Sequence, residues 1–272
     1  GNGSDELIQI ILMAIAADNA TVMSVEPSFV MYQMISKYCR LHYQGIPLTP
    51  DFELDKAAIL KAIKRRSPEV IFIAYPNNPT GNLFDPALIA EIIQTTQGLV
   101  VIDEAYAAFS DHSFKDDLQK YDNLLLMRTV SKMGLAGLRL GYLCGPAALV
   151  GELDKLRLPY NINSLTQASA EFALLNRDEI DKQTHEICIQ RENLFKKMSA
   201  IGRLKVYPSQ ANFILFRCPA DSGDRVFKSI LDDGVLIKNL SKAGPALKDC
   251  LRVTVGTSEQ NAAFINSLIK AI

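Results

Sequence analysis

Two residues of this sequence could carry out chemistry together, Asp103 and Lys132. Asp103 closes an apolar run at residues 98–103, and Lys132 closes a second run at 123–132. If both runs are buried strands, a carboxylate and an amine lie at strand ends. Pyridoxal phosphate requires such a pair, because a lysine holds its aldehyde as a Schiff base and a carboxylate keeps its ring nitrogen protonated. The pair therefore predicts a pyridoxal phosphate site, with no metal.

Each residue of the pair also has an ordinary alternative. An aspartate after a strand is often only a helix N-cap or a loop residue. A lysine between two strands can be a surface residue on a turn. In the functional interpretation, partial desolvation and neighbouring positive charge make the amine of Lys132 nucleophilic.

A phosphate group could be bound at two places near this pair. Ser131 and Arg139 flank Lys132, and a hydroxyl together with a guanidinium suits a phosphate. Residues 3–5, Gly3-Ser4-Asp5, open the first predicted helix, where free backbone N–H groups form an anion site. An ordinary N-cap with an acidic first turn is the alternative for residues 3–5.

Four further side chains could contact a cofactor or a substrate. The phenol of Tyr106 could donate to an oxyanion, and Asn78, in the turn at 77–81, could direct its amide at a ring oxygen. Phe29 could cover an aromatic ring, with core packing as its alternative. Arg252 lies in an apolar strand and needs an anionic partner, which could be a substrate carboxylate or a structural salt bridge.

Composition excludes several classes of function. The chain has 272 residues, 48% of them hydrophobic, and a net charge of -1, so no basic surface for nucleic acid or anionic membrane is expected. Its longest apolar stretch, residues 7–17, is too short to span a bilayer, and no targeting signal is visible. Five scattered cysteines indicate reduced thiols and a cytoplasmic location, and three isolated histidines make a zinc site improbable.

Helices and apolar strands alternate over the first part of the chain. Helices are predicted at 5–17, 29–37, 55–66 and 86–96, and strands at 21–25, 40–44, 70–74, 99–102, 124–127 and 138–143. Apolar and polar residues do not alternate along these strands, which indicates a parallel sheet covered on both faces. In such sheets ligand sites form at the carboxyl ends of the strands.

The pattern changes after about residue 159. Helices are predicted at 164–175 and 179–201, followed by short strands at 211–217, 235–238 and 251–255 and helices at 224–231 and 259–271. We therefore expect a large cofactor domain at 1–163, connecting helices at 164–201 and a smaller α+β domain at 202–272.

The joint order of these residues resembles the fold-type I, class-II pyridoxal-phosphate-dependent aminotransferases, and within them the histidinol-phosphate aminotransferase family. The likeness covers essentially the whole chain. It is carried by the stretches Gly3-Ser4-Asp5-Glu6, Pro76-Asn77-Asn78-Pro79-Thr80-Gly81, Ile102-Asp103-Glu104-Ala105-Tyr106, Thr129-Val130-Ser131-Lys132, Ala136-Gly137-Leu138-Arg139-Leu140-Gly141-Tyr142 and Leu251-Arg252-Val253-Thr254-Val255-Gly256-Thr257.

The resemblance implies a role for each candidate residue. Lys132 would carry the cofactor and shuttle a proton, and Asp103 would pair with the ring nitrogen. Four other roles follow from the resemblance: the ring hydroxyl would be bound by Tyr106, as a catalytic residue, and by Asn78; the ring face by Phe29; the phosphate by Ser4, Asp5, Ser131 and Arg139; and the substrate by Arg252 and Asn78.

The resemblance also implies substrates and an assembly. The chain would exchange an amino group between histidinol phosphate and 2-oxoglutarate in histidine biosynthesis, as a cytoplasmic homodimer. Relatives carry several dozen more residues before Gly1, including a first strand and a tyrosine that reaches the neighbouring subunit's phosphate. The step of seven from Lys132 to Arg139 is one shorter than in some relatives.

Two alternatives remain open at this point, and a third can be set aside. Threonine-phosphate decarboxylases and aromatic or general aminotransferases share the same residues. An aminotransferase-like effector domain of a transcription regulator is a non-enzymatic alternative. A nucleotide-binding α/β domain is disfavoured, because neither GxGxxG nor GxxxxGK[ST] occurs.

Overall fold

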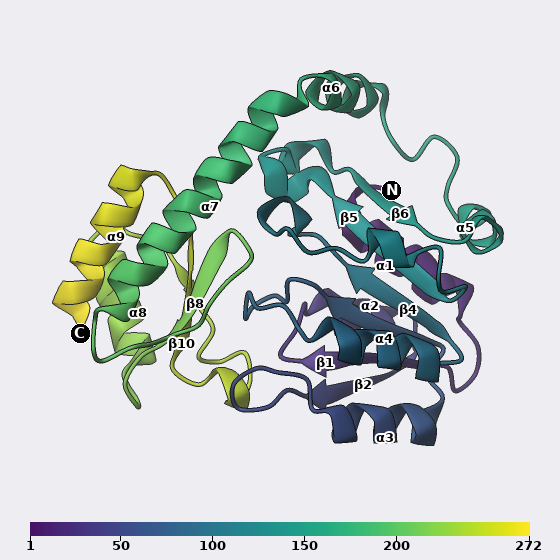
Figure 1. Cartoon of the computed structure of the whole chain (residues 1–272), viewed down its shortest axis with the longest axis horizontal. Helices are drawn as coiled ribbons and strands as arrows, with labels where there is room; N and C mark the ends of the chain where they lie inside the picture. The colour runs from purple at the N-terminus through teal and green to yellow at the C-terminus, as the bar shows by residue number, and fades with distance from the viewer.

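The computed structural model describes all residues, 1–272, and contains two β-sheets joined by long helices (Figure 1). The larger sheet has six strands in the order β2-β1-β3-β4-β5-β6. Its strands are β1 Thr21–Glu26, β2 His42–Pro47, β3 Val70–Ala74, β4 Leu99–Asp103, β5 Leu124–Thr129 and β6 Gly141–Cys144. All neighbouring strands run parallel except β6, which pairs antiparallel with β5.

Helices cover both faces of the larger sheet, which explains why its strands are apolar throughout. In β3, Val70 and Phe72 pack toward α1 Gly3–Ala14 and α2 Met31–Tyr38, together with Leu153 of α5 Ala147–Asp154. Ile71 and Ile73 pack on the other face, against α3 Lys56–Arg66 and α4 Pro86–Thr95. Burial on both faces removes the alternation of apolar and polar residues that a half-exposed strand shows.

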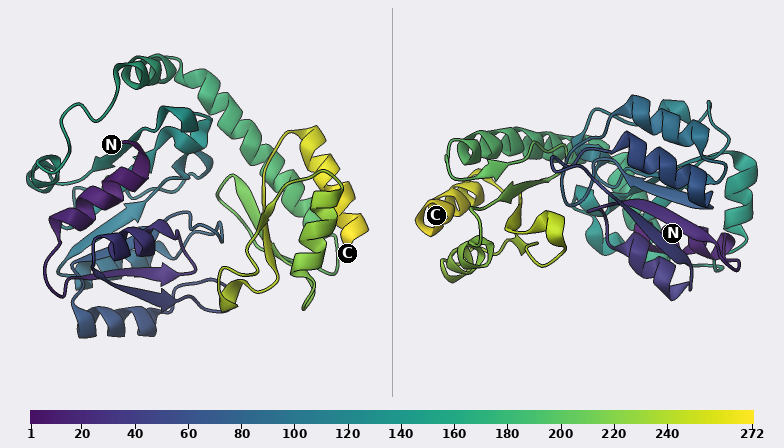
Figure 2. Two further views of the ribbon diagram at one scale, coloured as in Figure 1. Left: turned by 180° about the vertical axis from the view of Figure 1, so that it is seen from behind. Right: turned by 90° about the horizontal axis from the view of Figure 1, so that it is seen from below.

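The second sheet has four antiparallel strands in the order β7-β8-β10-β9. Its strands are β7 Lys205–Val206, β8 Phe213–Arg217, β9 Lys238–Asn239 and β10 Cys250–Thr254. One face is covered by α7 Arg177–Ser199, α8 Gly223–Asp232 and α9 Ser258–Ala271. Figure 2 shows that α7 bridges the space between the two sheets, after the shorter helix α6 Ser164–Leu175.

The predicted α/β fold with a mostly parallel sheet flanked by helices is confirmed, with local corrections. The strand predicted at 138–143 begins only at Gly141, because Arg139 adopts a left-handed φ of 48° after the turn at Ala136–Leu138. The strand predicted at 40–44 likewise begins at His42, since Arg40 has a φ of 59° where the chain leaves α2. The helix predicted at 5–17 spans Gly3–Ala14.

Besides the five short 3₁₀ helices, two elements were not predicted, helix α5 and the short strand β7. None of the helices combines the length and the apolar character that a membrane span requires.

Candidate active site

A pocket lies where the parallel strands of the larger sheet end, as the sequence predicted. It is lined by all of the candidate residues except Arg252, namely Ser4, Asp5, Phe29, Asn78, Asp103, Tyr106, Ser131, Lys132 and Arg139. Ala74, Pro76, Ala105 and Thr129 complete its wall. Because the carboxyl ends of parallel strands meet at one edge, residues far apart in the sequence come together here.

Asp103 ends β4 and is almost fully buried, with 3% of its surface exposed. The backbone N–H of Ala105 donates to its Oδ1 at 3.0 Å, and the hydroxyl of Tyr32 donates to its Oδ2 at 2.7 Å. Burial raises the pKa of the Asp103 carboxyl to about 6, and these two donors and the charge of Lys132 limit the rise. The carboxylate is therefore buried away from solvent and contacts groups that favour its charged form.

Lys132 lies in the short 3₁₀ helix Val130–Met133 that follows β5. Burial lowers the pKa of its amine, the positive charge of Arg252 lowers it further, and Asp103 opposes both effects. The Nζ atom lies 5.3 Å from the centre of the Tyr106 ring. A desolvated amine of this kind is more readily found in its neutral, nucleophilic form than an exposed lysine.

The N-terminus of α1 and the Arg139 side chain form one wall of the pocket. Gly3 has a φ of +78°, and a Cβ atom on it would come within 2.8 Å of Arg139 Nη2. Arg139 also donates to Asp5 Oδ2 at 3.3 Å. The first backbone N–H groups of a helix have no partner within it, so this wall combines free donors, the helix dipole and a guanidinium.

Ser131 is held in place by the residue at the end of β5. Thr129 Oγ1 accepts a hydrogen bond from Ser131 N at 3.1 Å and lies 2.9 Å from Ser131 Oγ. Thr129 thereby caps the turn that carries Lys132, and it directs the serine toward the same pocket.

Arg252 lies beside the pocket, in a cleft that it shares with Phe29 and Asn78. Its Nη1 donates to Asn78 Oδ1 at 2.5 Å, and its guanidinium lies 4.5 Å from the centre of the Phe213 ring. Its Nε is buried and has no hydrogen-bond partner. No carboxylate of the chain pairs with Arg252, so the structural salt bridge considered from the sequence is absent and the guanidinium is available to an anion.

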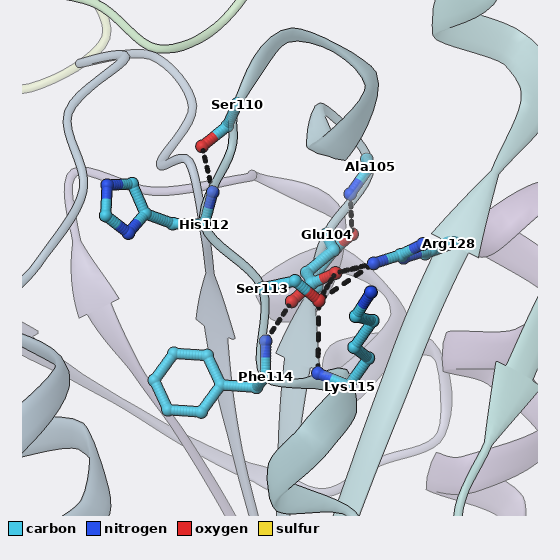
Figure 3. Close-up of polar contacts among 9 residues, drawn as sticks. Glu104, Ala105, Ser110, His112, Ser113, Phe114, Lys115 and Arg128 are labelled. Atoms are coloured by element: carbon cyan, nitrogen blue, oxygen red, sulfur yellow. Dashed lines mark hydrogen bonds and ion pairs between the residues drawn. The ribbon is translucent and has the colours of Figure 1, made fainter.

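Glu104 follows Asp103 but does not line the pocket. Its buried carboxylate forms an ion pair with Arg128 (Figure 3). Its Oε2 accepts hydrogen bonds from Arg128 Nε at 2.9 Å and Nη2 at 2.6 Å and from Ser113 Oγ at 3.0 Å. Its Oε1 accepts from Phe114 N at 2.7 Å. These bonds tie the connection after β4, which includes Tyr106, to β5.

Tyr32 is a polar neighbour of the site that sequence reasoning missed. Its ring is fully buried, and it lies three residues after Phe29, in the first turn of α2. A signal was present, because a tyrosine on the buried face of a predicted helix needs a partner for its hydroxyl. The sequence alone did not indicate that this partner is Asp103.

Comparison with known proteins identifies the family of the chain. The sequence model of the family described as aminotransferase class I and II matches residues 1–268. The chain belongs to this family. Like its members, it is an aminotransferase.

Two curated members of the aminotransferase family are similar over almost the whole chain. "Histidinol-phosphate aminotransferase 2" of Nitrosococcus oceani is 53% identical over 268 residues, which are 98% of this chain and 74% of the relative. "Histidinol-phosphate aminotransferase" of Vesicomyosocius okutanii is 54% identical over 270 residues, 99% of this chain and 75% of the relative.

Solved structures of the aminotransferase family share the fold. The histidinol-phosphate aminotransferase of Clostridium acetobutylicum superposes with a TM-score of 0.90 at 22% identity, covering 98% of this chain and 81% of that one. The enzyme of Sinorhizobium meliloti, solved in complex with pyridoxal-5′-phosphate, superposes with a TM-score of 0.85 at 22% identity. It covers 100% of this chain and 75% of that one.

Proposed function

We propose that this aminotransferase uses pyridoxal 5′-phosphate to exchange an amino group between histidinol phosphate and 2-oxoglutarate in histidine biosynthesis. The observation that carries the proposal is the meeting of Asp103 and Lys132 in one pocket at the strand ends. The names of the curated relatives support the choice of substrate. When bound, the cofactor supplies an aldehyde that condenses with amines and a ring that accepts electrons.

The donor set of the pocket fits the two ends of this cofactor. Asp103 offers a buried carboxylate for a protonated ring nitrogen, and Lys132 offers a desolvated amine for the aldehyde. At the other wall, the N–H groups of Ser4 and Asp5 and the side chain of Arg139 offer donors for a phosphate. A cofactor that is cationic at one end and anionic at the other matches this distribution of charge.

The remaining pocket residues would orient the cofactor. Phe29 would cover one face of the ring, and Tyr106 and Asn78 would donate to its hydroxyl. Ser131 would add a donor to the phosphate, beside Lys132. Lys132 would then carry a proton to and from the α-carbon of the substrate.

Arg252 would bind the anionic group of each substrate. Its buried Nε lacks a partner, which is costly unless an anion occupies the cleft. A carboxylate of 2-oxoglutarate or the phosphate of histidinol phosphate would supply the missing acceptor, and a guanidinium binds either one with two hydrogen bonds.

A second copy of the chain is the partner that we propose. The segment around α6 exposes large apolar side chains, including Tyr160 at 97%, Leu165 at 81% and Phe172 at 70% exposed. Large apolar side chains that gather exposed on one segment are typical of an interface between subunits. Phe172→Glu should turn a dimer into a monomer in analytical ultracentrifugation, whereas Leu236→Glu, at an exposed leucine in the loop before β9, should not.

A cytoplasmic location is also proposed. It is supported by the five cysteines, all of which are free thiols in the structure, as is usual for proteins of reducing compartments.

The cofactor proposal is tested by the absorbance of the purified protein mixed with pyridoxal phosphate. A visible band should form in the wild type and in Lys120→Ala, an exposed lysine, and should be missing in Lys132→Ala. A band that persists in Lys132→Ala, or no band in the wild type, would disprove the assignment.

The substrate proposal needs its own assay. L-histidinol phosphate and 2-oxoglutarate should yield glutamate, with ping-pong kinetics. If the band forms but no glutamate appears, the cofactor assignment stands and the substrate is wrong. Release of carbon dioxide from threonine phosphate would then point to the decarboxylase alternative.

A further inference from the structure

The Tyr32 side chain makes its only hydrogen bond to a pocket residue, Asp103. Its hydroxyl donates to Asp103 Oδ2 at 2.7 Å, and it does not line the pocket itself. A group in this position cannot touch a ligand, but it can determine the direction and charge of the carboxylate that does.

The Tyr32 hydroxyl is held in place by packing on several sides. The ring stacks on Phe72 of β3, with centres 4.8 Å apart and planes 12° apart. The edge of Phe29 packs against it at 5.5 Å, and Ser36 Oγ donates to the backbone oxygen of Tyr32 at 2.6 Å. Because folding already fixes this ring, the hydrogen bond to Asp103 needs no further ordering of the side chain.

The two donors to Asp103 approach different oxygens. Ala105 N–H donates to Oδ1, and the Tyr32 hydroxyl donates to Oδ2. Each carboxylate oxygen can accept about two hydrogen bonds, so both oxygens retain capacity for a group in the pocket. Fixing both oxygens also prevents the carboxylate from rotating about its Cβ–Cγ bond.

The charged groups around Asp103 act on its carboxyl in opposite directions. Lys132 favours the ionised carboxylate, whereas Asp5 and burial disfavour it, and burial is the largest effect. The hydrogen bond from Tyr32 is the strongest of the effects that oppose burial.

We propose that Tyr32 is a positioning residue for cofactor binding, whose hydroxyl orients the Asp103 carboxylate and keeps it ionised toward the ring nitrogen of pyridoxal phosphate. The proposal rests on the proposed function for the identity of the cofactor. The contact between Tyr32 and Asp103 is independent of it.

Tyr32→Phe removes the hydroxyl and leaves the stacked ring. Its affinity for pyridoxal phosphate, measured by absorbance titration, should fall about tenfold or more, as expected for the loss of a hydrogen bond to a charged group. The matched control is Tyr75→Phe, since Tyr75 is 2% exposed and packs edge-on against Phe114. Only its backbone N–H bonds to Asp103, at the backbone oxygen, so the substitution removes no hydrogen bond from the Asp103 carboxylate. Its affinity should stay at the wild-type value.

A double-mutant cycle separates positioning from packing. In an Asp103→Asn background, Tyr32→Phe should have little further effect on the affinity, because the carboxylate that the hydroxyl serves is gone. An equal loss of affinity in both backgrounds would show that Tyr32 acts only through packing and would overturn the proposal. So would a wild-type affinity in Tyr32→Phe.

A second readout needs no cofactor. In a carboxyl-carbon NMR titration of the protein alone, the pKa of Asp103 should lie higher in Tyr32→Phe than in the wild type or in Tyr75→Phe. An unchanged pKa would overturn the proposal. If the wild type binds no pyridoxal phosphate, the proposed function fails, and this titration still decides whether Tyr32 controls the charge of Asp103.

Discussion

Replacing Glu104 with glutamine should lower the stability of the fold sharply. The Glu104 side chain is fully buried, and four hydrogen bonds from Arg128, Ser113 and Phe114 end on its carboxylate. A glutamine has the same shape but only one acceptor oxygen. Its amino group would replace the other carboxylate oxygen and would face N–H or O–H groups that need an acceptor. The guanidinium of Arg128 then loses its only anionic partner while only 26% of that side chain is exposed.

The size of the effect follows from the burial of the pair. Breaking a buried ion pair by removing one partner costs about 3–5 kcal/mol, and the partial exposure of Arg128 favours the lower end, about 3 kcal/mol. This is a large share of the roughly 5–15 kcal/mol that stabilises a typical protein. At about 2–4 °C per kcal/mol for a chain of this size, the melting temperature should fall by roughly 6–12 °C.

Thermal unfolding followed by circular dichroism measures this change. The control is Asp181→Asn, which breaks the exposed pair with Arg177, whose side chains are 51% and 69% exposed. That variant should lose no more than about 0.5 kcal/mol. If Glu104→Gln melts within about 1 °C of this control, the argument from desolvation and hydrogen bonding at Glu104 is refuted.

Two further variants test the pocket walls. Gly3→Ala should weaken pyridoxal phosphate binding about tenfold, because its Cβ would displace Arg139. The control is Gly134→Ala, where φ is +85° and the space around the residue is open. That variant should show only the backbone strain, about 1 kcal/mol of stability. Equal affinities in titrations of the two variants would contradict this. Asp103→Asn should stabilise the cofactor-free protein near pH 7 by about 2–3 kcal/mol, because a folded pKa of about 6 lies above the unfolded value and the ionised carboxyl destabilises the fold. This gain should shrink as the pH falls from about 6 to 4 in urea-unfolding curves; a gain that is constant over this range would argue against a raised pKa.

Much of the larger sheet could be predicted because its strands are short, apolar and separated by clear helical patterns. Strand β3 was predicted at its observed bounds, 70–74, and β4 and β5 differ only at their ends. The errors lie where one residue takes a left-handed conformation, as at Arg40 and Arg139, which a hydropathy pattern does not reveal. The antiparallel direction of β6 also could not be read from the sequence, since pairing depends on the path of the chain and not on residue type.

The pocket could be predicted because parallel strands end at one edge, so that residues after β3, β4 and β5 must meet. Contacts between elements far apart in the sequence were harder to foresee. The bond from Tyr32 to Asp103 and the bond from Arg252 to Asn78 each depend on how separate elements pack. The domain boundaries at 163 and 201, and the role of each site residue, stay predictions that the experiments above can test.

The contact between Arg252 and Asn78 determines which hydrogen-bonding group the Asn78 side chain presents to a ligand. An asparagine amide looks nearly the same after a half-turn about its last bond, yet its oxygen accepts hydrogen bonds and its nitrogen donates them. Because Arg252 can only donate, it holds the oxygen of Asn78 and leaves the Nδ2 group for a ligand. Arg252, which is placed to bind the substrate, thus also makes Asn78 present a hydrogen-bond donor. At Asn78 the pocket should therefore bind an oxygen of the ligand and not an N–H group.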